Sequence, residues 1–394
     1  MIWKNKGHEN DYIAKQLIET YSEKPQIYVF GASIKGRELA VTLRRYNCFA
    51  GYIDNSVEKQ RQGFEKDRVY SLNEFLSRRD GFIVISVSQK NITIINEQLK
   101  SFGLLNNADY FFYDEFCNDI FPMLSVYYYN LSFISLAQIT LTERCTLKCK
   151  KCAHGCFAVD NRVITDLTVE QAYKSADSFF SKVDFIKEFV LIGGEPLLYE
   201  KLENVIQYIG RKYREKIGIY SITTNGTIVP KEEVVRACRE YDVLIRISNY
   251  SGQLPHLKER YERLTEYLKK SNISYLIREE QLEWMDYGFD YLDRKATKDE
   301  LIQVFDSCHT PCREIRENRF YYCVMARSVS ENLGYHVGQE DYLDLEKLTG
   351  ENYKKELLEF TLGYSKKGYL DMCNHCYGAE AKKRPIPAAE QVKR

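Results

Sequence analysis

The sequence predicts an α/β protein with two parallel sheets, followed by a small region rich in cysteine. Short apolar runs alternate with amphipathic stretches in the first 118 residues and again from about residue 133. From about residue 300 this alternation fades and cysteines recur. With 394 residues, the chain also exceeds the size that one hydrophobic core usually supports. We therefore expect three domains, over residues 1–118, 133–300 and 301–394.

Composition and charge narrow the class of protein. Hydrophobic residues make up 44% and charged residues 28%, which is ordinary for a folded soluble protein. Basic and acidic residues both number 56, so no overall positive field attracts nucleic acid or an anionic membrane. Neither a secretory signal nor an uninterrupted membrane-spanning stretch is present. We expect a cytoplasmic protein with no nucleic-acid or membrane partner, whose 12 cysteines include metal ligands.

The first domain is expected to hold a parallel sheet. An apolar strand at 26–30 runs into GASIKG at 31–36, a second strand ends at Asp54, and a third covers 82–88. This order resembles a Rossmann-like domain, in which a helix N-terminus holds pyrophosphate and a carboxylate holds ribose. Ser33 replaces the central glycine of the GxGxxG pattern and narrows that approach. A nucleotide or nucleotide-sugar ligand and a purely structural role both stay open.

The second alternation predicts a partial (β/α)6 barrel, similar to part of a TIM barrel. Its strands are separated by longer amphipathic helices. Barrels of this kind assemble their active sites at the carboxyl ends of the strands. The expected strands lie near residues 132–141, 188–194, 217–224, 243–248 and 273–279.

The loop after the first barrel strand reads TLTERCTLKCKKC and carries Cys145, Cys149 and Cys152 at CxxxCxxC spacing. Thiolates suit iron–sulfur clusters, and three protein ligands leave one iron of a four-iron cluster open. A zinc site is the alternative. Cys156 and His154 follow closely, and we expect a spectator thiol and a polar loop residue there.

Polar residues follow the ends of three further predicted strands. Paired glycines let the backbone approach a ligand, and a carboxylate complements an amino group. Because the carboxyl ends of parallel strands meet on one face, we expect these residues beside the cysteine loop. They are Gly193, Gly194, Glu195, Thr224, Asn225, Arg246, Ser248 and Asn249.

These motifs resemble the radical S-adenosylmethionine (radical SAM) superfamily, most clearly over residues 138–250. The resemblance implies that the three loop cysteines hold a [4Fe-4S] cluster whose open iron binds S-adenosylmethionine, and that the GGEP segment binds its amino group. The residues after the next two strands would contact its ribose and carboxylate. Reductive cleavage then gives methionine and a 5'-deoxyadenosyl radical that abstracts a substrate hydrogen. Lys151 departs from the pattern, since that position is commonly aromatic in the superfamily.

The last third of the chain resembles the twitch or SPASM-like regions that carry one auxiliary [4Fe-4S] cluster. Asn318 stands where the related pattern has glycine, and asparagine tolerates a left-handed backbone. Either Cys308 or Cys312 can complete the four ligands, and a structural zinc is the alternative. The candidate ligands are Cys308, Cys312, Cys323, Cys373 and Cys376.

The resemblance implies a radical SAM enzyme of the oxidoreductase or transferase type, supplied with electrons by a donor such as flavodoxin or ferredoxin. The N-terminal domain favours oxidation, epimerisation or another modification of a sugar or nucleotide-linked small molecule. Peptide maturation is the enzymatic alternative, although the first 130 residues show no small winged peptide-recognition domain. The remaining alternative is a non-catalytic iron–sulfur or zinc protein.

Overall fold

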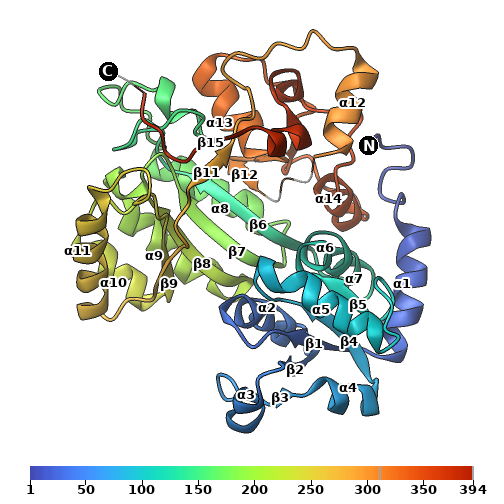
Figure 1. The fold of residues 1–394 in the computed structure, drawn as a ribbon. Helices are drawn as coiled ribbons and strands as arrows, with labels where there is room; N and C mark the ends of the chain where they lie inside the picture. The colour runs from blue at the N-terminus through green and yellow to red at the C-terminus, as the bar shows by residue number, and fades with distance from the viewer. Residues whose placement is uncertain (309, 311, 393–394) are drawn as a thin grey trace. The chain divides into compact units, whose positions relative to one another are not determined.

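The computed structural model describes residues 1–308, 310 and 312–392 and divides the chain into two compact units (Figure 1). One unit comprises residues 8–135, and the other joins residues 1–7 to the part of the chain from 136 onward. The α/β class with parallel sheets is confirmed. The boundary expected at residue 300 falls inside the second unit and stays a prediction.

The first unit contains a five-stranded sheet in the order β3-β2-β1-β4-β5, in which every neighbouring pair is parallel. Two of its strands, β3 and β5, were not predicted, because they are only two and three residues long. The elements are α1 (Asp11–Glu23), β1 (Gln26–Phe30), α2 (Ile34–Arg45), β2 (Phe49–Ile53), α3 (Val57–Gln62), β3 (Val69–Tyr70), α4 (Leu72–Arg78), β4 (Gly81–Ile85), α5 (Gln89–Ser101), β5 (Tyr110–Phe112), α6 (Tyr113–Glu115), a π-helical turn (Phe116–Ile120) and α7 (Phe121–Tyr127).

The turn between β1 and α2 follows from its glycines and its serine. Gly31 has a φ of +122°, and a Cβ there would lie 2.6 Å from the backbone oxygen of Ser86. A Cβ on Gly36 would lie 2.2 Å from the Gly31 oxygen, so close packing of helix against strand requires glycine. The Ser33 hydroxyl accepts a hydrogen bond from the Gly36 N–H and caps α2.

The second unit is organised around an eight-stranded sheet in the order β10-β9-β8-β7-β6-β12-β13-β14, with helices α8 to α11 following its strands (Figure 1). The neighbouring strands from β7 to β10 pair in parallel. The strands are β6 (Phe133–Thr140), β7 (Phe185–Ile192), β8 (Ile217–Thr224), β9 (Val243–Ile247), β10 (Tyr275–Ile277), β12 (Arg313–Arg316), β13 (Arg319–Tyr321) and β14 (Tyr342–Asp344).

Capping residues mark several helix starts of this unit. Thr168 with Gln171 forms a capping box at the start of α8, and Thr297 with Glu300 forms one at α12. The remaining elements are α8 (Val169–Phe180), α9 (Leu202–Tyr213), α10 (Glu232–Glu240), α11 (Leu257–Lys270), α12 (Lys298–Asp306), α13 (Val324–Leu333), α14 (Tyr353–Thr361), and the antiparallel pair β11 (Glu283–Met285) and β15 (Pro385–Pro387).

The C-terminal third continues the main sheet. β12 pairs in parallel with β6, and β13 and β14 extend the sheet by antiparallel pairing. These strands are three or four residues long and carry charged residues, so no hydrophobic periodicity predicts them. Across the described residues, no helix combines the length and the apolar character needed to cross a membrane.

Candidate radical cluster site

The loop after β6 brings together the three cysteines of the CxxxCxxC motif. Cys145 and Cys149 are each 8% exposed. Burial raises the pKa of both thiols, in the case of Cys149 to about 12, and the neighbouring Cys152 raises both further. Thiols that influence one another in this way lie close together. Three clustered thiols are the donor set that a four-iron cluster with one open iron requires.

Cys156 and Cys152 influence each other's ionisation. A hydrogen bond from the Cys156 thiol is the largest of the influences that lower the pKa of Cys152 to about 6, while the pKa of Cys156 itself is raised. Cys156 is 1% exposed.

Side chains on both sides hold the loop in place. Arg144 makes two hydrogen bonds to the Asp166 carboxylate, at 3.0 and 2.6 Å. The Asn161 amide group donates to the Cys145 oxygen at 2.6 Å and accepts its N–H at 3.3 Å. Lys151, at the usually aromatic position, has a φ of 59° and forms ion pairs with Asp286 and Asp290.

The GGEP segment lies against the cysteine loop. The Gly194 N–H donates to the Thr142 oxygen and the Glu195 N–H to the Arg144 oxygen, both at 2.8 Å. A Cβ on Gly194 would lie 2.3 Å from the Arg144 oxygen and 2.9 Å from the Cys145 Cβ, and one on Gly193 would lie 2.6 Å from the Thr142 oxygen. The two glycines are therefore required by the contact between β7 and the loop.

Glu195 links the ends of β7 and β8. Its carboxylate accepts hydrogen bonds from the Thr224 hydroxyl at 2.8 Å, the Asn225 N–H at 2.9 Å and the Leu197 N–H at 3.1 Å. The side chain is fully buried, and this burial raises the pKa of Glu195 to about 7 despite the three donors. The Asn225 side chain in turn donates to the Cys145 Sγ at 3.5 Å. The structure thus brings these predicted residues to one place.

The residues predicted on β9 separate into two groups. Ser248 lies at the strand end, where its N–H donates to the Thr224 oxygen at 2.9 Å. Asn249 lines a cavity of about 360 Å³ together with Tyr261 and Glu280. Arg246 lies within the strand, where its Nε donates to Glu188 at 2.7 Å.

Glu188 is a buried charge that the sequence analysis did not identify. It accepts hydrogen bonds from Arg246 and, at 2.9 Å, from the Ser221 hydroxyl. The side chains of the ion pair are 7% and 10% exposed. The sequence does carry a signal for Glu188, which is a charged residue within an apolar strand. Such a residue is rarely buried without a partner.

Four of the five C-terminal cysteines surround one cavity. Each of them affects, or is affected by, the ionisation of others in the group. The charged neighbours of the Cys312 thiol are Arg313, Arg278, Glu188 and Glu314. The group that lines the cavity is Cys308, Cys323, Cys373 and Cys376.

Within the described ranges, no group of three His, Cys, Asp or Glu side chains has the close arrangement that holds a single metal ion.

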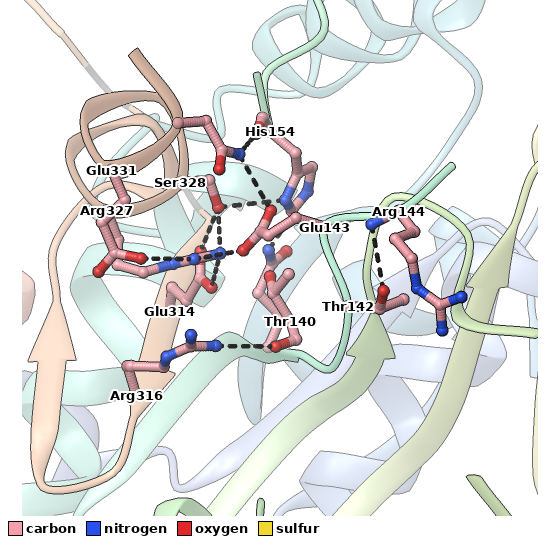
Figure 2. Close-up of polar contacts among 12 residues, drawn as sticks. Thr140, Thr142, Glu143, Arg144, His154, Glu314, Arg316, Arg327, Ser328 and Glu331 are labelled. Atoms are coloured by element: carbon pink, nitrogen blue, oxygen red, sulfur yellow. Dashed lines mark hydrogen bonds and ion pairs between the residues drawn. The ribbon is translucent and has the colours of Figure 1, made fainter. Parts of the chain in front are cut away.

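A buried ionic network connects the two cysteine regions (Figure 2). Arg327, on α13, forms ion pairs with Glu143 at 2.5 Å and Glu314 at 2.6 Å, and the Arg327 and Glu314 side chains are fully buried. The Ser328 hydroxyl donates to Glu314 at 3.2 Å and lies 3.3 Å from the His154 Nδ1. No sequence motif predicts this network, because its members are far apart in the chain.

The first unit has a cavity of about 440 Å³ at the carboxyl ends of β1, β2 and β4. Asp54, expected to hold a ribose, already has partners on both oxygens. One accepts the Ala32 N–H at 3.0 Å and the Lys59 ammonium at 2.9 Å, and the other accepts the Ser56 N–H at 2.9 Å. In this structure the Asp54 carboxylate fixes the loops around the cavity.

Comparison with known proteins agrees with this geometry. Residues 139–284 match the family model of the radical SAM superfamily, so this part of the chain is a radical SAM domain. Proteins of this superfamily are in general enzymes, and the domain implies a [4Fe-4S] cluster and S-adenosylmethionine as cofactors. The donor set of the cysteine loop fits that cluster.

Two curated relatives match parts of the chain. GTP 3',8-cyclase of Aquifex aeolicus (strain VF5) is 32% identical over 111 residues, which cover 27% of this chain and 32% of the cyclase. Molybdenum cofactor biosynthesis protein 1 of Dictyostelium discoideum is 32% identical over 96 residues, which cover 24% of this chain and 14% of that protein. The chain thus spans a third or less of the length of these relatives.

Solved structures show weaker likeness. BtrN, in complex with AdoMet and 2-DOIA, has a TM-score of 0.36 and 12% identity and covers 66% of this chain and 97% of its own. AnSMEcpe, with bound AdoMet and Cp18Cys peptide, has a TM-score of 0.30 and 21% identity and covers 37% and 42%. SuiB of Streptococcus suis, bound to the precursor peptide SuiA, has a TM-score of 0.29 and 18% identity and covers 48% and 44%. Likeness at this level carries no argument about substrate.

Proposed function

We propose that this protein reductively cleaves S-adenosylmethionine at a [4Fe-4S] cluster held by Cys145, Cys149 and Cys152. The observation that carries the proposal is the meeting of these thiols with Glu195 and Asn225. Cysteine ligands and polar residues from three successive strand ends converge at the carboxyl end of the sheet, where β/α barrels place their active sites.

When bound, the cluster and S-adenosylmethionine together supply a 5'-deoxyadenosyl radical for hydrogen abstraction. The chain's own residues bind and orient. When ionised, the Glu195 carboxylate would accept N–H groups of the amino end of the cofactor. Gly193 and Gly194 let β7 pack against the cysteine loop beside it. Thr224 and Asn225 fix the orientation of that carboxylate. Ser248 and Asn249 would contact the nucleoside part.

The contact with the nucleoside that the resemblance implies for Arg246 stays a prediction. The ion pair of Arg246 with Glu188 supports a further role of this residue in balancing a buried charge within the sheet. Removing either partner of such a pair leaves an uncompensated buried charge, so the loss of one partner is strongly destabilising.

A second [4Fe-4S] cluster is held by Cys308, Cys323, Cys373 and Cys376. The support is their grouping around one cavity, from which Cys312 is absent. Four thiolates leave no open iron, so this cluster transfers electrons or fixes geometry and does not bind S-adenosylmethionine. A cluster that accepts an electron from the substrate radical favours net oxidation of the substrate.

The substrate is a small molecule of the sugar or nucleotide-linked class. The support is the cavity of about 440 Å³ in the first unit, which lies at a strand-order switch where α/β sheets bind ligands. A small electron-transfer protein of the flavodoxin or ferredoxin type supplies the electrons.

Deuterium transfer tests the proposed function. The anaerobic holoprotein is reduced in the presence of S-adenosylmethionine and a panel of deuterated sugars, nucleotide sugars and peptides. We expect deuterium in 5'-deoxyadenosine with one of the sugar-containing compounds. Transfer from a peptide alone would replace the proposed substrate class, and a protein that forms neither cluster would remove the proposal as a whole.

A further inference from the structure

The segment from residue 385 to 392 lies along the cysteine loop. It begins as β15, which pairs with β11. Beyond β15, the Lys150 N–H donates to the Glu390 oxygen at 2.6 Å and the Val392 N–H donates to the Lys148 oxygen at 2.8 Å. Cys149 and Gln391 face each other as an antiparallel bridge between these two bonds. A part of the chain more than 200 residues away thus covers the middle cysteine of the motif.

The Gln391 side chain is held in one orientation. Its Oε1 accepts the Lys148 N–H at 2.7 Å, so the amide nitrogen must lie on the other side. That nitrogen donates to the Ala389 oxygen at 2.6 Å and to the Cys149 Sγ at 3.2 Å. The two N–H groups and the carbonyl all have partners, and one N–H is directed at the cysteine sulfur.

A second cysteine of the motif has a comparable donor. The Asn225 amide donates to the Cys145 Sγ at 3.5 Å. The sulfurs of Cys145 and Cys149 therefore each receive a side-chain amide N–H, and the two donors come from different parts of the chain. The described hydrogen bonds of the Gln391 side chain join only the cysteine loop and the neighbouring Ala389.

We propose that Gln391 is a positioning residue for the radical cluster, whose hydrogen bond to the Cys149 sulfur raises the cluster's reduction potential. The inference rests on the proposed function, because it requires a cluster on the three cysteines. Reduction adds an electron whose charge is shared with the ligand sulfurs. An N–H dipole directed at a sulfur stabilises this added negative charge. Gln391 thereby makes reduction by a flavodoxin-type donor easier.

Two substitutions separate a redox role from a structural one. Gln391→Leu removes both the donor and the acceptor. Gln391→Glu keeps an acceptor for the Lys148 N–H but replaces the donor with a negative charge. If Gln391 tunes the cluster, the reduction potential of the cluster should fall in the leucine variant and fall further in the glutamate variant. If the role of Gln391 is structural, the glutamate variant should stay closer to wild type than the leucine variant does. Glu390→Gln is the matched control, since it removes only a surface ion pair with Lys150.

The measurement is a reductive titration of the anaerobic holoprotein followed by electron paramagnetic resonance, with iron content determined in parallel. The radical cluster is identified as the part of the reduced signal that changes when S-adenosylmethionine is added, because only an open iron binds it. We expect Gln391→Leu to lower the ratio of reduced to oxidised cluster about tenfold at a fixed ambient potential, which corresponds to about 59 mV. The Glu390→Gln ratio should match wild type.

Other outcomes would overturn the inference. They are a leucine variant within twofold of the wild-type ratio, or a glutamate variant that stays closer to wild type than leucine does. If the leucine variant loses iron, the test rests on the glutamate variant. A ratio of reduced to oxidised cluster equal to that of wild type in the glutamate variant then overturns the inference. A wild-type protein with no signal that responds to S-adenosylmethionine would instead overturn the proposed function itself.

Discussion

Arg327 and Glu143 form a buried ion pair that joins the two cysteine regions of the second unit. Their side chains are 0% and 6% exposed. Arg327 follows Cys323 on α13, and Glu143 precedes Cys145 on the radical loop. Asn332, also on α13, donates to Glu143 at 3.2 Å and to the His154 oxygen at 2.7 Å. The helix that starts at one cluster site therefore holds the loop of the other.

Arg327→Met should destabilise the protein by about 3 to 5 kcal/mol, because it leaves two buried carboxylates without their cation. The free energy of unfolding from urea titrations of the holoprotein measures this. Arg162→Met is the control, since the Arg162 side chain is 90% exposed and its pair with Asp160 should contribute nothing measurable. Equal stability of the two variants would show that the buried network does not hold the loop.

Cys308 and Cys312 should respond differently to substitution. Cys308→Ala removes one of the four thiols around the cavity, so the protein should lose the iron of one cluster after reconstitution. Cys312→Ala should retain the wild-type iron and sulfide content. Loss of iron in the Cys312 variant, with normal iron in the Cys308 variant, would reverse the ligand assignment.

Cys156→Ala should keep the radical cluster, because Cys156 lies outside the CxxxCxxC trio and the proposed cluster takes no ligand from it. Cys152→Ala is the matched comparison and should lose that cluster's iron. The spectrum of the Cys156 variant should still change when S-adenosylmethionine is added. A wild-type cluster that ignores S-adenosylmethionine, together with a Cys156 variant that responds, would identify Cys156 as a fourth ligand.

Binding of S-adenosylmethionine should weaken as the pH falls below neutral. Burial raises the pKa of Glu195 from 4.5 to about 7, so the carboxylate that accepts the cofactor's N–H groups is ionised above pH 7 and protonated below it. At pH 6 about one carboxyl in ten is ionised, and the dissociation constant should be about tenfold higher than at pH 8. Anaerobic equilibrium dialysis of the oxidised holoprotein measures this.

The control for this pH dependence is Glu195→Gln, which has no carboxyl to titrate. Its affinity should be lower than that of wild type at pH 8 and nearly constant from pH 6 to 8. A similar slope in both proteins would assign the pH dependence to another group.

Sequence patterns predicted what depends on local spacing and periodicity. The alternation of strands and helices predicted the parallel sheets, and the CxxxCxxC spacing predicted thiols close enough to share a cluster. Strand ends placed Glu195 and Asn225 beside Cys145. Each of these follows from residues a few positions apart.

Contacts between distant segments could not be predicted in this way. The pairing of β12 with β6 and the ion pair of Glu188 with Arg246 depend on tertiary packing between short elements. The choice between Cys308 and Cys312 depends on the path of the chain after α12. The hydrogen bond of Gln391 to Cys149 joins residues 242 positions apart, and no short motif encodes such a contact.

The most direct test is formation of 5'-deoxyadenosine by the anaerobically reduced holoprotein with S-adenosylmethionine. Wild type should release 5'-deoxyadenosine and methionine in equal amounts, and a variant with Cys145, Cys149 and Cys152 replaced by alanine should release neither. Protein that carries a reduced four-iron cluster on these cysteines yet releases no 5'-deoxyadenosine would contradict the central claim.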